Sequence, residues 1–76
     1  MNKQRRKAIE DIVTDIRLKL EELEALKDEE EEYKDNIPEN LQATERYERA
    51  EECVYGLQEV IDDIDRALDN VDEYIE

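Results

Sequence analysis

The chain has 76 residues, with 25 acidic and 11 basic side chains, so its formal net charge at pH 7 is −14. A chain this short usually buries too little apolar surface to be stable without a disulfide, a metal or a partner chain, and one cysteine with no histidine excludes an internal disulfide and a Cys/His zinc site. Since no apolar run reaches the length of a membrane span and the N-terminus lacks the apolar segment of a signal peptide, we expect a soluble, cytoplasmic protein.

The first predicted element is a helix over residues 3–34. Charged residues make up 47% of the chain, and it contains one glycine and one proline, which favours helix. Apolar side chains recur at the three- and four-residue spacing of one helix face. They are Ile9, Ile12, Ile16, Leu20, Leu23, Leu26 and Tyr33, with Val13 at the edge of the stripe.

Residues 35–43 form the second predicted element, a corner. Asp35 and Asn36 prefer to bond to their own neighbouring backbone, and the only proline, Pro38, disfavours helical dihedral angles at the residue before it. Thr44 is a suitable N-cap for a further helix. The chain is therefore predicted to turn here and to begin a second long helix.

The third predicted element is a helix over residues 44–75. Its apolar positions alternate in steps of three and four residues across four heptads. These positions are Tyr47, Ala50, Val54, Leu57, Ile61, Ile64, Leu68, Val71 and Ile75. A strongly acidic chain poor in aromatic residues could also be disordered, but disordered chains do not keep such a register.

The two helices match in length and the connection is short, which predicts an all-α fold: a coiled-coil-like antiparallel two-helix hairpin in a single domain, residues 1–76. We expect Ile12 to face Leu68 and Leu26 to face Val54. Val60, Ala67 and Tyr74 widen the stripe beyond what one hairpin covers, so we expect two hairpins to dimerise into a four-helix bundle, or one hairpin to bind another protein. The predicted oligomer seam contains Tyr47, Val54, Leu57, Val60, Ile61, Ile64, Leu68, Val71 and Ile75.

The sequence contains no pattern typical of an enzyme. There is no histidine, no glycine-rich phosphate loop and no nucleophile beside a base. The acidic segment IDDIDRALDNVDE suggests a calcium loop, but its apolar residues keep helical register throughout and no glycine supplies the turn that such a loop needs. We therefore predict no catalysis, no cofactor and no metal site.

The acidic residues of the second helix are the candidate binding surface. From Ala50 onward there are ten acidic residues and one basic residue, Arg66. Such a surface attracts basic clefts, many of which bind nucleic acid, and it repels nucleic acid itself. We expect Asp62, Asp65 and Asp69 to point away from the seam between the helices. The predicted protein-binding set is Tyr55, Glu59, Asp62, Asp63, Asp65, Asp69, Asp72 and Glu73.

A resemblance covers nearly the whole chain. The junction DNIPENLQATERYE, preceded by MNKQRRKAIEDI and followed by AEECVYGLQEVIDDIDRALDNVDEYIE, resembles a family of small, acidic, largely uncharacterised helical proteins encoded by phages and prophages of Gram-positive bacteria. The resemblance implies no catalytic residues. It implies a context in which small phage proteins inhibit host defence, such as anti-CRISPR and anti-restriction proteins, and a location in the host cytoplasm.

Two functions from different classes remain open. The first is an inhibitor whose acidic helical face binds a basic host protein, for example a nucleic-acid-binding, CRISPR or restriction protein, as a nucleic-acid mimic. The second is a self-assembling structural or adaptor coiled coil, a homodimer without mimicry, whose charge only confers solubility. Neither reading involves direct contact with nucleic acid or with a membrane.

Overall fold

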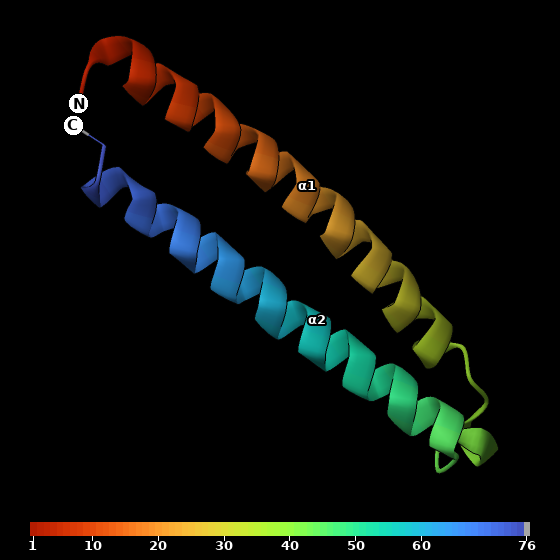
Figure 1. The fold of residues 1–76 in the computed structure, drawn as a ribbon. Helices are drawn as coiled ribbons and strands as arrows, with labels where there is room; N and C mark the ends of the chain where they lie inside the picture. The colour runs from red at the N-terminus through yellow and green to blue at the C-terminus, as the bar shows by residue number, and fades with distance from the viewer. Residues whose placement is uncertain (76) are drawn as a thin grey trace.

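The structure is a computed structural model that describes residues 1–75, and it confirms the all-α prediction. The chain is 87% helical, with no strand among the described residues. The order of elements is α1 (Lys3–Asp35), a 3₁₀ turn η1 (Glu39–Leu41), α2 (Glu45–Asp69) and a 3₁₀ turn η2 (Asn70–Glu73). Figure 1 shows α1 and α2 running antiparallel, with the start of α1 and the end of η2 at the same end of the molecule.

Local hydrogen bonds fix where each long helix begins. The side-chain oxygen of Asn2 accepts a bond from the Arg5 N–H at 2.7 Å, so Asn2 is the N-cap of α1. The Thr44 hydroxyl accepts a bond from the Tyr47 N–H at 3.4 Å and donates one to the Leu41 carbonyl at 2.7 Å. Thr44 is therefore the N-cap of α2, as the sequence predicted, and it also ties this helix to the corner.

The corner and the end of α2 differ slightly from the predicted boundaries. Helix α1 ends at Asp35, one residue later than predicted, and Pro38 is the N-cap residue of the 3₁₀ turn η1. The α-helical part of α2 ends at Asp69, and residues 70–73 continue as a 3₁₀ turn where an α-helix was expected to reach residue 75. The Asn70 N–H bonds to the Ala67 carbonyl as well as to that of Leu68, which tightens the last turn.

The molecule is long and thin. Its principal extents are 60 × 16 × 11 Å and its radius of gyration is 17.7 Å. A compact domain of this length has a radius of gyration of about 11 Å. Two helices side by side have no third layer, so most residues keep one side toward solvent.

The seam between the helices holds the whole core. Among the described residues, the buried apolar side chains are Ala50, Ile61 and Leu68, all on α2. Four apolar side chains of α1 are half-buried beside this seam. They are Ile9, Val13, Leu20 and Leu23.

The predicted register of α1 is wrong, because four residues of its predicted apolar stripe are exposed, namely Ile12, Ile16, Leu26 and Tyr33. Ile12 and Leu26 are exposed instead of facing Leu68 and Val54, and Lys27 is buried with 7% of its surface accessible. The inner row of α1 is Val13, Leu20 and Lys27, one residue after the row that the apolar pattern favoured. One residue corresponds to about 100° around a helix, so this difference turns Ile12 and Leu26 out of the seam.

Candidate protein-binding surface

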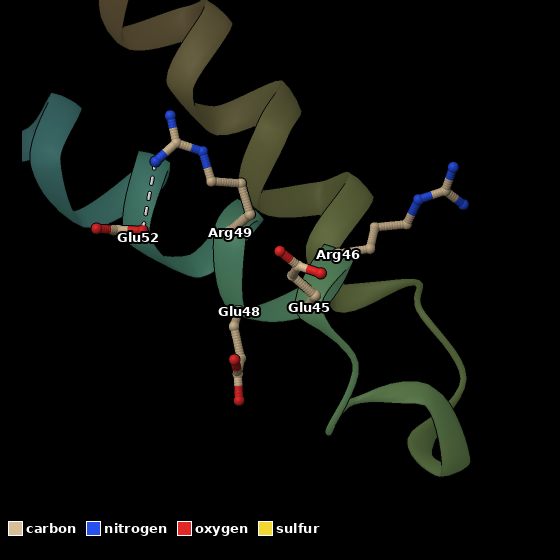
Figure 2. Close-up of a pocket in the computed structure, with 5 residues that line it drawn as sticks. All are labelled: Glu45, Arg46, Glu48, Arg49 and Glu52. Carbon is tan, nitrogen blue, oxygen red and sulfur yellow. Dashed lines mark hydrogen bonds and ion pairs between the residues drawn. The ribbon is translucent and has the colours of Figure 1, made fainter.

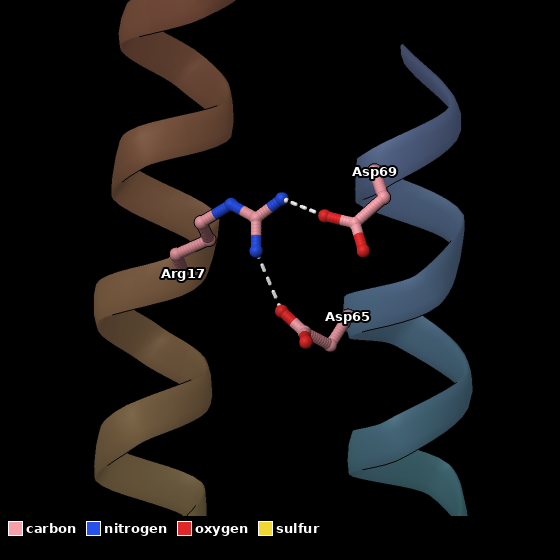
Figure 3. A network of polar contacts seen from close by, with 3 residues as sticks. All are labelled: Arg17, Asp65 and Asp69. Carbon is pink, nitrogen blue, oxygen red and sulfur yellow. Dashed lines mark hydrogen bonds and ion pairs between the residues drawn. The ribbon is translucent and has the colours of Figure 1, made fainter. Parts of the chain in front are cut away.

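A guanidinium bridge joins the two helices near the middle of the hairpin. Figure 3 shows Arg17 of α1 reaching toward two carboxylates of α2. Its Nη1 donates to Asp65 Oδ1 at 2.6 Å and its Nη2 donates to Asp69 Oδ1 at 2.8 Å. The hydrogen bond to Asp69 is the main cause that raises the pKa of Arg17, and the charges of Asp65, Asp69 and Asp72 act in the same direction.

This bridge corrects the expectation that Asp65 and Asp69 point away from the seam. Asp65 lies four residues after the buried Ile61, so the two residues are about 40° apart around α2 and Asp65 is at the edge of the seam. The long Arg17 side chain spans the remaining gap. These two carboxylates therefore link the two helices, and they are not unpaired anionic groups on an outer face.

Two of the other predicted binding residues form side-chain hydrogen bonds along their own helix. Asp62 accepts a hydrogen bond from Gln58 Nε2 at 2.9 Å, and Asp63 accepts one from Arg66 Nη1 at 3.1 Å. Both bonds lie within α2. The remaining predicted residues are exposed, namely Tyr55, Glu59, Asp72 and Glu73.

Lys27 was not singled out from the sequence, although the structure places it at the seam. Its Nζ lies 2.7 Å from Asp28 Oδ1 and 3.7 Å from Glu31 Oε2. The hydrogen bond to Asp28 raises the pKa of Lys27, while burial acts in the opposite direction. The heptad spacing of Val13, Leu20 and Lys27 was the signal that could have identified it, because it continues the inner row of α1.

Two adjoining clefts run between α1 and α2 on the side of the Arg17 bridge, and together we call them the acidic groove. The first is about 240 Å³ and the second about 420 Å³, and Gln58 and Asp62 line both. The first is lined by Arg17, Leu20, Glu21, Glu24, Gln58, Ile61, Asp62 and Asp65. The second is lined by Lys27, Glu31, Val54, Tyr55, Gln58, Glu59 and Asp62.

The charge of the groove is strongly unbalanced. Six carboxylates line it, from Glu21, Glu24, Glu31, Glu59, Asp62 and Asp65. The two cations in its lining, Arg17 and Lys27, are each already paired with two carboxylates. The groove therefore has a net negative charge. Three of its acids are on α1, which the sequence reasoning had left out of the candidate surface.

The most cationic part of α2 is at the corner. A shallow cleft there is lined by Glu45, Arg46, Glu48, Arg49 and Glu52, drawn in Figure 2. Arg49 pairs with Glu52 at 3.3 Å along the same helix. In Figure 2 the Arg46 side chain extends away from the other four. The two arginines thus give this end of the hairpin charges of both signs.

Within residues 1–75, no group of three or more potential metal ligands is gathered, and none of the helices is both long and apolar enough to cross a membrane. Comparisons with protein-family models, with curated proteins and with solved structures found no match.

Proposed function

We propose that this chain is a non-enzymatic, phage-type inhibitor that binds a basic, nucleic-acid-handling host or defence protein through the acidic groove. The single observation that carries the proposal is the gathering of six carboxylates from both helices around a groove whose two cations are already paired. Such a field attracts a basic cleft and speeds association with it. The resemblance of the corner to small phage proteins supports an anti-CRISPR or anti-restriction role.

The recognition would rest on many weak contacts that act together. Each exposed ion pair is worth only about 0–1 kcal/mol, and salt screens charges beyond about 8–10 Å. Carboxylates along the groove would stand where a basic cleft normally meets phosphates. Tyr55 at the groove edge is exposed and offers an aromatic face on which an arginine of the partner can stack.

A pair of triple variants with equal change of net charge tests the proposal. The groove triple neutralises Glu21, Glu24 and Glu59, each to Gln, and leaves the partners of Arg17 intact. The control triple neutralises three acids in a heptad row on the side of α1 that faces away from α2. These control changes are Asp15→Asn, Glu22→Gln and Glu29→Gln.

The assay is capture of proteins from a Gram-positive bacterial lysate on the immobilised chain, followed by binding measurements with the purified captured protein. We expect the groove triple to weaken binding at least tenfold, chiefly through slower association, while the control triple binds like the wild type. The wild-type chain should also displace a labelled DNA duplex or RNA from the captured protein. Equal weakening by both triples, or capture without displacement of nucleic acid, would contradict recognition by the groove.

The second candidate function is a self-assembling structural or adaptor protein, a homodimer that forms a four-helix bundle. The observation that favours it is the accessible surface of 6162 Å². A compact folded monomer of this mass exposes only about 4,900 Å². In this reading the negative charge confers solubility and the groove has no partner. Sedimentation velocity at tens of micromolar protein measures the self-assembly directly.

A further inference from the structure

Several of the exposed apolar residues of the two helices lie on one side of the hairpin, although Leu18 and Tyr55 lie elsewhere. On α1, Ile12 and Leu26 each lie one residue before the inner row of Val13 and Lys27. On α2, Val60 lies in the same position relative to the buried Ile61. Each of these residues is therefore turned by about 100° from the seam, in the same rotational sense on both helices.

The acidic groove defines the opposite direction of rotation. Arg17 lies four residues after Val13, and Asp65 lies four residues after Ile61, so both are turned about 40° the other way, and they meet at 2.6 Å. In an antiparallel pair of helices, rows turned in the same sense lie on the same side of the hairpin. The groove is on one side, and the apolar rows are on the other.

We call this second side the apolar face. Its members lie on α1, on α2 and, for Tyr74, directly after η2, and they are exposed or half-buried in the hairpin. They are Ile12, Leu26, Cys53, Val60, Ala67 and Tyr74. Leu26 is 60% exposed and Val60 is 48% exposed, in a chain whose buried apolar core contains only three side chains among the described residues.

The accessible surface area of the hairpin indicates how much surface a dimer could bury. The excess over a compact monomer is roughly 1,250 Å² for each chain, so two copies could together remove more than 2,000 Å². Obligate homodimers bury areas of this size and have apolar interfaces. A face of roughly 1,250 Å² on each hairpin, which is 60 Å long, is thus sufficient for a stable dimer.

The charges beside the apolar face indicate that its occupant is a second copy of this chain. At the corner end, helical spacing places Glu30, three residues after Lys27, on the α1 side of this face, and it places Arg46 and Arg49 on the α2 side. Consider a twofold axis that lies against the apolar face, parallel to the long axis of the hairpin. This axis places α1 of one copy over α2 of the other, which brings these opposite charges together. We propose that two copies pair through the apolar face, with both acidic grooves left open on the outside of the resulting bundle.

This proposal rests on the self-assembly suggested above, and it makes a distinctive prediction about salt. Each copy carries a net charge of −14, so long-range repulsion opposes pairing and added salt should strengthen the dimer. Binding of a basic partner to the groove should weaken under the same change. Opposite salt dependences would separate the two surfaces.

A matched pair of substitutions tests the face. Leu26→Lys and Leu18→Lys make the same chemical change on the same helix, at residues that are 60% and 54% exposed. Leu18 borders a cleft formed only by α1 residues, away from α2, whereas Leu26 is on the apolar face. Val60→Lys tests the contribution of α2. Sedimentation velocity and sedimentation equilibrium, from about 1 to 100 µM and at 50 and 500 mM NaCl, measure the dissociation constant.

We expect the wild type and Leu18→Lys to be dimers whose dissociation constant falls with added salt, and Leu26→Lys and Val60→Lys to raise that constant at least tenfold. If a variant unfolds when it dissociates, its thermal midpoint should fall relative to the wild type and should depend more steeply on protein concentration. A monomeric wild type would overturn both the self-assembly and the apolar face as its surface. A dimeric wild type with equal effects of Leu18→Lys and Leu26→Lys would overturn the face alone.

Discussion

Leu68 is buried in the seam, so the loss of unfolding free energy on truncating it to alanine can be predicted and compared with the same change at an exposed leucine. Leu68→Ala removes three carbons from a side chain that is 8% exposed. At about 0.8 kcal/mol for each buried carbon, the transfer contribution alone is about 2.4 kcal/mol, and incomplete collapse around the gap adds to it. We therefore expect the free energy of unfolding to fall by about 2–3 kcal/mol, near the low end for leucine because the seam of two helices is open at its edges.

The size of this effect matters because the total stability is small. A domain of this length has a free energy of unfolding of about 4–11 kcal/mol, so Leu68→Ala should remove a large part of it. Leu18→Ala makes the same chemical change at a side chain that is 54% exposed and away from both the seam and the apolar face. It should cost less than about 1 kcal/mol, because the better helix propensity of alanine offsets part of the lost burial.

Urea denaturation followed by circular dichroism at 222 nm, at one fixed protein concentration, measures both variants. The fixed concentration keeps any contribution of self-association constant. A loss below about 1 kcal/mol for Leu68→Ala, or equal losses for the two leucines, would refute the position of the seam. A changed slope with urea would instead indicate a change in the surface exposed on unfolding.

Three further predictions concern the cap, the bridge and the buried lysine. Thr44→Ala should cost about 1 kcal/mol of unfolding free energy, measured by urea denaturation, because α2 loses its N-cap. The control Thr14→Ala, at an exposed site inside α1, should be neutral or slightly stabilising. Arg17→Gln should lower the thermal midpoint more than Arg66→Gln, because the first loses bonds between helices and the second loses one within α2, and equal effects would count against the bridge. The pKa of Lys27 is raised above its ordinary 10.5, so its stabilising contribution is complete below pH 10.5 and is lost as the pH rises through the raised pKa. Arginine stays charged at high pH, so between neutral pH and pH 11.5 the Lys27→Arg variant should lose less unfolding free energy than the wild type, as denaturation at the two pH values would show.

Much of the candidate site could not be predicted because its residues are distant in sequence. The acidic residues of α2 form a run that is visible in the sequence. Glu21 and Glu24 face the same groove only because the hairpin brings residues about 40 positions apart together. The pairing of Arg17 with Asp65 spans 48 positions, and it changes the role of that carboxylate from a free charge to a link between helices.

The sequence by itself determined the two helices and the corner, because their causes are local. The three- and four-residue spacing, the proline at position 38 and the cap at Thr44 each act on neighbouring backbone. Tertiary structure alone decided which side of α1 turns inward. The apolar stripe of α1 is wide enough to offer two rows about 100° apart, and local periodicity favoured Ile12 with Leu26 over Val13 with Leu20. Packing against α2 selected the second row, together with Lys27, whose long side chain can lie in the seam while its ammonium group reaches Asp28 and Glu31.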